Sequence, residues 1–169
     1  MNTHIERSAE ISDCGMYRWW LRRTWQVVNG KGTCCFIMLN PSTADGNVDD
    51  PTIRRCIGFA KTWGYGTLMV RNLFPWRATD PAVLRGKTKS MITGGHRGDI
   101  ELMSAMSSDL VVAAWGADVP GFRDIDAKAI FRKHPEKVIH CLGTTKHGCP
   151  RHPLYVRADQ LPLVYRVDQ

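Results

Sequence analysis

The sequence has 169 residues, of which 43% are hydrophobic, so it is long enough for one domain with a sizeable buried core. Its 23 Lys and Arg outnumber its 16 Asp and Glu, and the net charge of +7 favours an anionic partner such as nucleic acid. No apolar run approaches the length of about 18 residues that a membrane span needs, so we expect no membrane partner. We also expect a monomeric, cytoplasmic protein with one domain over residues 1–169.

The N-terminal part of the chain is predicted to form an arm and a hairpin strand. Residues 1–15 show no clear periodicity and are expected to be a loose arm. Residues 17–28 alternate between two faces, and the turn formers at residues 29–32 predict antiparallel pairing with the strand that follows. We interpret the interleaved Trp and Arg side chains as an edge strand whose arginines face water, with a nucleic-acid surface as the alternative.

The next segment combines a strand, a rigid turn and a helix. Residues 34–39 carry no charge and end at Asn40-Pro41, which predicts a buried strand followed by a sharp turn. Asp50 precedes Pro51, a pattern typical of a helix N-terminus, and the helix is expected to end at Gly64.

Strands and helices are then predicted to alternate. The expected strands cover residues 67–73, 109–115 and 138–142, and a helical segment precedes each of the last two. This order predicts an α/β three-layer sandwich with a central, mostly parallel four-stranded sheet and an N-terminal antiparallel hairpin strand. In such sheets, ligands bind outside the carboxyl ends of the strands.

The segments after the predicted strands resemble a known domain family. The motif Leu-Asn-Pro-Ser-Thr-Ala-Asp at residues 39–45, with Asn-Leu-Phe at 72–74 and Pro-Arg-His-Pro-Leu-Tyr at 150–155, resembles a widespread bacterial and phage family of unknown function. This resemblance covers most of the chain but implies no activity.

Three segments also resemble, more remotely, the uracil-DNA glycosylase superfamily. Residues 37–42 are similar to the first motif of its mismatch-specific branch, residues 109–117 to its third strand and residues 152–154 to its second motif. The resemblance implies a glycosylase-like fold and a hydrolase that releases a damaged or modified base, as in DNA repair. Ser42 stands where the branch has Gly, and Leu154 stands where the motif has a Ser that helps pinch the DNA backbone, which weakens DNA as the substrate more than base binding.

The resemblance and the residue chemistry together predict a site. Asn40 would orient the attacking water, Asp45 would be the base, with Asp49 and Asp50 behind it, and His152 would donate a hydrogen bond to the departing base. For each of these residues the alternative is structural: an Asx turn, a cap or a packed loop histidine. Further residues are expected to bind the base or the nucleic acid by stacking or by phosphate contacts, namely Pro41, Ser42, Asn72, Phe74, Trp76, Arg77, Lys146, His147 and Arg151.

Metals and cofactors are not predicted. Cys34 and Cys35 lie in an apolar run, which favours reduced thiols, and no Cys or His pair has CxxC or HxxxH spacing. Two other functions stay open: a non-catalytic module of the same fold that binds a nucleotide or modified base, and a Mg²⁺-dependent phosphoryl hydrolase that uses Asp45, Asp49 and Asp50.

Overall fold

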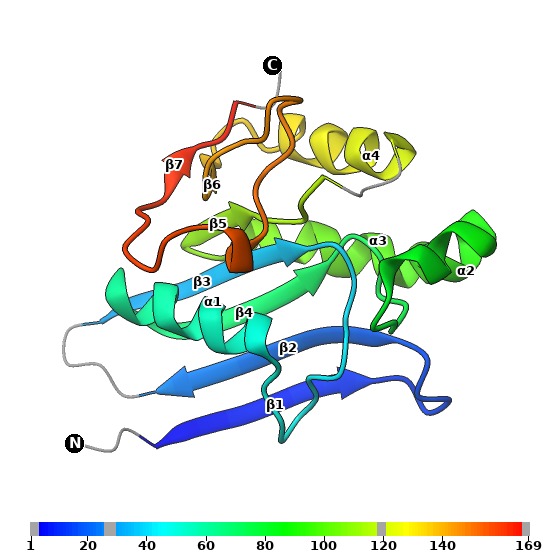
Figure 1. Cartoon of the computed structure of the whole chain (residues 1–169), viewed down its shortest axis with the longest axis horizontal. Helices are drawn as coiled ribbons and strands as arrows, with labels where there is room; N and C mark the ends of the chain where they lie inside the picture. The colour runs from blue at the N-terminus through cyan, green and yellow to red at the C-terminus, as the bar shows by residue number, and fades with distance from the viewer. Residues whose placement is uncertain (1–3, 26–29, 118–120, 167–169) are drawn as a thin grey trace.

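A seven-stranded sheet organises the chain (Figure 1). The computed structural model describes residues 4–25, 30–117 and 121–166, apart from the side chains of residues 121–125. The sheet has the order β1-β2-β4-β3-β5-β6-β7. Its strands are β1 (Ile5–Ile11), β2 (Arg18–Trp25), β3 (Lys31–Met38), β4 (Tyr65–Asn72), β5 (Leu110–Ala113), β6 (Ile139–Cys141) and β7 (Leu163–Val164).

The prediction of a central four-stranded sheet is wrong, because the sheet has seven strands, but the predicted α/β class is confirmed. The neighbours β4, β3, β5 and β6 run parallel, whereas β1, β2 and β7 add antiparallel strands at the two edges. The missed edge strands have weak sequence patterns: β1 alternates little, and β7 has only two residues. The parallel strands still place four carboxyl ends at one edge of the sheet, where ligands of such folds bind.

The N-terminal segment also differs from its prediction. Residues expected to be a loose arm form β1, which pairs with β2 along its whole length. β2 pairs with β4 and not with β3, because β3 already has parallel partners on both sides. The predicted turn at residues 29–32 lies partly outside the described residues.

Helices cover both faces of the sheet. Figure 1 shows α1 (Pro51–Thr62) across one face and α3 (Gly95–Met103) behind the other, which α2 (Lys89–Thr93) and α4 (Gly121–Arg132) also cover. The described ranges also contain three short 3₁₀ helices: η1 (Pro81–Gly86), η2 (Ser104–Ser107) and η3 (Pro153–Tyr155). Asp50 caps α1 as predicted, since its Oδ1 accepts a hydrogen bond of 2.8 Å from the Ile53 amide. Within the described part of the chain, no helix is long and apolar enough to cross a bilayer.

Two apolar cores lie on the two sides of the sheet. Along β3, Cys34 and Phe36 face the α1 side, whereas Cys35 and Ile37 face α3 and α4. On the α1 side, the rings of Phe36, Phe59 and Trp63 stack with centroids 5.3–6.5 Å apart. Burial of both faces explains why the central strands are continuous apolar runs and do not alternate.

Arg23 of β2 is fully buried, contrary to the prediction that the arginines of this strand face water. Its Nε donates to Asp49 Oδ1 at 2.7 Å, and its Nη2 donates to the carbonyl of Asp45 at 2.6 Å. The sequence contained a signal for this burial, because Arg23 shares its strand face with Leu21 and Trp25. This buried cation therefore fastens the loop after β3 to the sheet.

Arg18 is also buried, with 2% of its surface exposed, and it reaches the same face by a different route. The β1–β2 register skips Trp19, since Glu10 pairs with Trp20 while Ile11 pairs with Arg18. A β-bulge of this kind reverses the alternation of side chains. The bulge thus turns Arg18 toward the loop after β3.

Candidate functional site

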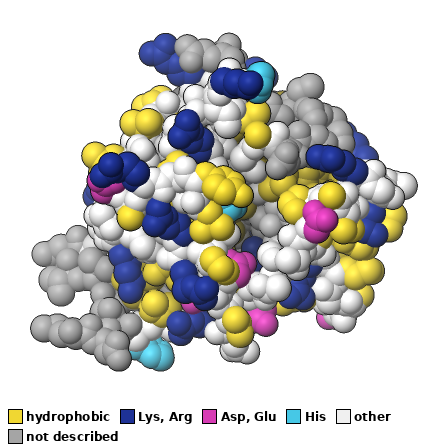
Figure 2. All heavy atoms as spheres, viewed as in Figure 1, with side chains coloured by type: hydrophobic (Ala, Val, Ile, Leu, Met, Phe, Trp, Pro, Cys, Tyr) yellow, Lys and Arg dark blue, Asp and Glu magenta, His cyan; other side chains and the backbone are white. Residues whose placement is uncertain are grey.

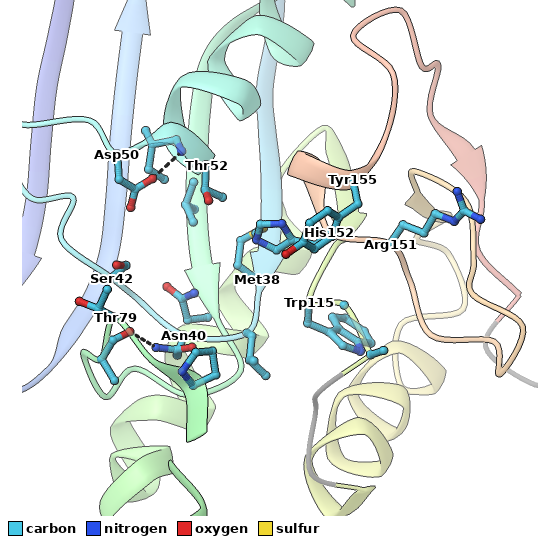
Figure 3. A pocket seen from close by; sticks show the side chains of 18 of the residues that line it. Met38, Asn40, Ser42, Asp50, Thr52, Thr79, Trp115, Arg151, His152 and Tyr155 are labelled. Carbon is cyan, nitrogen blue, oxygen red and sulfur yellow. Dashed lines mark hydrogen bonds between the residues drawn. The ribbon is translucent and has the colours of Figure 1, made fainter. Parts of the chain in front are cut away.

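A pocket of about 570 Å³ opens at the carboxyl ends of the four parallel strands (Figure 3). The end of every parallel strand, or the loop after it, contributes to the lining, and the first turn of α1 closes one side. Among the lining residues are Asn40, Ser42, Asp50, Thr52, Asn72, Trp115, Gly116, Lys146, Arg151, His152 and Tyr155. The volume falls in the range typical of sites for small ligands.

Asn40 lines the pocket with its amide group held in one orientation. Its Nδ2 donates to the carbonyl of Ala78 at 2.7 Å and to that of Pro41 at 3.1 Å. The Ala78 amide in turn donates to the Pro41 carbonyl at 2.9 Å, so the loops after β3 and β4 are joined here. No described residue donates to Asn40 Oδ1, which leaves this oxygen able to accept from a water or a ligand.

The carboxylate of the pocket is that of Asp50, whereas Asp45 is not among the described lining residues. Asp45 Oδ1 accepts from the amides of Asn47 and Val48 at 2.7 and 2.9 Å, and these hydrogen bonds lower the pKa of Asp45. Asp45 therefore stabilises the turn of its own loop. Asp50 uses Oδ1 to cap α1, and its Oδ2 accepts from no residue in the described ranges.

His152 lies across the pocket from Asp50, and its ring points into the pocket (Figure 3). Its Nδ1 accepts from the Leu154 amide at 3.3 Å, so the neutral ring carries its proton on Nε2. Burial lowers the pKa of His152, and the charge of Asp50 partly opposes this effect. At neutral pH His152 is thus an uncharged N–H donor.

The pKa of His152 gives a direct test of this geometry. We expect NMR titration of the ring to place the pKa below the ordinary value of 6.5, and Asp50→Asn to lower it further because a nearby negative charge is lost. Since the folded state disfavours the protonated ring, the contribution of His152 to stability is full above pH 6.5 and is lost as the pH falls through the lowered pKa. Asp80→Asn, which changes the cap of η1 outside the pocket, should leave the titration unchanged.

Arg18 and Asn72 form the polar floor of the pocket. Arg18 Nη2 donates to Asn72 Oδ1 at 3.1 Å, and Nη1 donates to the Ala44 carbonyl at 2.9 Å. Burial lowers the pKa of Arg18 to about 10, so the guanidinium remains charged at neutral pH. Its Nε, like Asn72 Nδ2, is buried without an acceptor among the described residues. The floor therefore contains two buried N–H donors without an acceptor among the described residues.

The rim of the pocket is basic and aromatic. Lys146 and Arg151 are exposed there, and Lys and Arg side chains are spread over this face of the molecule (Figure 2). Tyr155 is 79% exposed, and its ring centroid lies 5.6 Å from that of His152. The sequence had suggested Phe74 and Trp76 as stacking residues, whereas at the rim of this pocket Tyr155 presents an exposed aromatic ring.

The other predicted site residues lie outside the main pocket. Phe74 and Pro41 are buried, and His147 is exposed on the loop before His152. Trp76 and Arg77 line a second, shallower hollow beside the pocket. The structure therefore gathers Asn40, Ser42, Asn72, Lys146, Arg151 and His152 into one pocket and leaves the remaining predicted residues apart from it.

Arg18 and Tyr155 of the pocket were not among the predicted site residues, and Asp50 was predicted only as a carboxylate behind Asp45. Arg18 could not be assigned to the pocket, because only the bulge at Trp19 turns its side chain inward. Asp50 was considered mainly as the cap of α1. The loop after β3 places this cap at the edge of the sheet where the parallel strands end, so the residue also lines the pocket. Tyr155 had a signal, because it lies in the same short motif as His152.

The three aspartates of the metal hypothesis do not form a cluster. Asp45 stabilises its own turn, Asp49 pairs with Arg23 and Arg7, and Asp50 faces the pocket. Across the described ranges, no three His, Cys, Asp or Glu side chains lie close enough together to hold a metal ion. The arrangement therefore offers hydrogen bonds and one carboxylate to a ligand.

Comparisons with known proteins identify the family of the chain. No curated protein and no solved structure matched it. The profile of DUF1643, described as a protein of unknown function, matches residues 18–154, which include both Arg18 and His152. The matched segment contains all four parallel strands and every residue of the pocket except Tyr155. Since this match covers most of its length, the chain belongs to the DUF1643 family.

Proposed function

We propose that the pocket binds a nucleobase and that the protein hydrolyses the N-glycosidic bond of a damaged or modified base in nucleic acid, with DNA favoured. One observation carries this proposal: the Asn40 amide oxygen, the Asp50 carboxylate and the His152 N–H donor line a single pocket at the strand ends. The basic rim with Lys146 and Arg151 suits a phosphate backbone. The remote resemblance to the uracil-DNA glycosylase superfamily points the same way.

The reaction needs a nucleophile on one side of the sugar and a stabilised leaving base on the other. Asn40 Oδ1 accepts a hydrogen bond from water and orients it, while Asp50 accepts the proton that this water loses. The water oxygen forms a bond to the anomeric carbon as the bond from carbon to base nitrogen breaks. The bonding electron pair leaves with the base, and His152 Nε2–H stabilises the negative charge on it.

A binding module without hydrolysis is the second candidate, and one observation favours it. Asn40 Nδ2 donates to two backbone carbonyls, as expected of a residue that shapes a turn. In a binding module the same pocket would hold a nucleotide or modified base, and Asn40 would only position the loops. Binding without base release distinguishes this function from the glycosylase.

The test is to incubate the protein with DNA, RNA and free nucleosides that carry damaged or hypermodified bases. Mass spectrometry should detect a free base. His152→Ala and Asn40→Ala should each lower the rate by about 10²–10³-fold, the usual cost of removing one stabilising hydrogen bond from a transition state. His96→Ala, which changes an exposed histidine of α3 outside the pocket, is the matched control and should retain the wild-type rate. Ligand binding with no base from any substrate would favour the binding module.

A further inference from the structure

A second hollow of about 430 Å³ lies beside the main pocket. The two share Ser42, Ala78 and Thr79, so one ligand can extend across this wall into both. Ser42 and Thr79 lie on the side of the main pocket away from Arg151 (Figure 3). The hollow itself is closed by the turn between β1 and β2, which contributes residues 14–16, and by the loop after β4.

The chemistry of the hollow suits an anion. Of the described residues that line it, Arg77 is the one with a charged Lys, Arg, Asp or Glu side chain. Arg77 Nη1 donates to the Gly15 carbonyl at 3.2 Å, whereas its Nε is buried with no acceptor in the described part of the chain. A second cation, Lys87, lies near the hollow. Its Nζ is 4.3 Å from the ring centroid of Trp76, which lines the hollow.

Three hydroxyl groups complete the lining, and they belong to Ser42, Thr43 and Thr79. No side-chain hydrogen bond joins any of the three to a described residue, so all can turn toward a ligand. A guanidinium with several hydroxyl donors matches a phosphate group, whose oxygens accept many hydrogen bonds. Asp45, on the same loop as Ser42 and Thr43, does not line the hollow, and its Oδ1 accepts from two amides of its own turn.

We propose that this hollow is a phosphate subsite, and that it binds a phosphate group attached to the nucleoside whose base enters the main pocket. The assignment rests on the proposed function for the identity of that base. The phosphate has two possible sources with the same chemistry: the terminal phosphate of a mononucleotide, or a phosphodiester of a nucleic acid strand. Arg77 supplies the charge, and the three hydroxyls fix the orientation.

The test uses full-length ¹⁵N-labelled protein and two probes that carry no base: inorganic phosphate and an abasic phosphodiester trimer. Both probes should produce saturable NMR shifts at the Arg77 Nε–H and the Thr43 amide. Arg77→Gln should raise the Kd at least tenfold, since a charged hydrogen-bond donor is lost. Arg85→Gln, in η1 and outside both cavities, is the matched control and should leave the Kd unchanged.

The outcomes separate the alternatives. Tighter binding of the trimer than of inorganic phosphate assigns the subsite to a nucleic acid strand, and equal binding assigns it to a terminal phosphate. The proposal is overturned if neither probe gives a saturable shift at these groups, or if Arg77→Gln and Arg85→Gln behave alike. Should Arg77→Gln not fold, the double variant Thr43→Ala/Thr79→Ala must weaken binding at least threefold. Because the probes lack a base, a failure of base release leaves this result intact.

Discussion

Replacing Asp50 with Asn should lower the rate of base release by about 10²–10⁴-fold, the range expected when a general base is removed. An amide cannot accept the proton of the attacking water, and it carries no charge to stabilise a cationic sugar. Asn caps helices as well as Asp does, so the free energy of unfolding should stay within about 1 kcal/mol of wild type. Initial rates of base release and urea unfolding measure the two effects.

Asp80→Asn is the control for the Asp50 variant. Asp80 caps η1 through the same kind of hydrogen bond, which its Oδ1 accepts from the Ala82 amide, but it does not line the pocket. Its replacement should leave the rate of base release unchanged. A rate within threefold of wild type for Asp50→Asn would remove this carboxylate from the mechanism.

Replacing Arg23 with Ala should lower the free energy of unfolding by about 3–5 kcal/mol, which is the cost of breaking a buried ion pair on one side. The guanidinium is fully buried, and its loss leaves the Asp49 carboxylate, whose side chain is 10% exposed, without its closest cation. The Asp45 carbonyl loses the Arg23 donor as well, and the Val48 carbonyl keeps the hydrogen bond from the Asp45 amide but loses that from Arg23. Since this loop leads directly to Asp50, base release should also decline.

Urea unfolding of Arg23→Ala should be compared with that of Arg22→Ala. Arg22 is the preceding residue of β2 but is exposed, and its Nε donates to Thr24 Oγ1. Surface changes of this kind usually stay within about 0.5 kcal/mol. If both variants unfold alike, Arg23 does not fasten the loop.

The parts of the fold that depend on local patterns could be predicted from the sequence. The uncharged run at residues 34–39 with Asn40-Pro41 after it marked a buried strand and its turn, and Asp50-Pro51 marked the start of α1. Long-range pairing could not be predicted in the same way. The turn formers after β2 suggested pairing with β3, but β4 and β5 occupy both edges of that strand.

Site residues that follow the ends of parallel strands could be predicted from the sequence. Site residues could not be predicted where the direction of the side chain determines whether it reaches the pocket. Asn40 lies just after β3, and His152 lies at the end of the loop after β6. Both residues line the pocket. Phe74 also follows a strand, but it turns into the core. Arg18 enters the pocket only through a bulge, which has no residue signature in β2. Asp45 and Asp50 both lie in the segment after β3, and only packing shows which carboxylate faces the pocket.

The central claim is that one pocket at the strand ends releases a base from nucleic acid. The most direct measurement counts free base and abasic sites in the same reaction, with wild type and Asp50→Asn run side by side on nucleic acid rich in modified bases. We predict equal numbers of free bases and abasic sites with wild type, and initial rates for both products about 10²–10⁴-fold lower with Asp50→Asn. Equal release by the two proteins, or none by wild type across the whole substrate set, would contradict the claim.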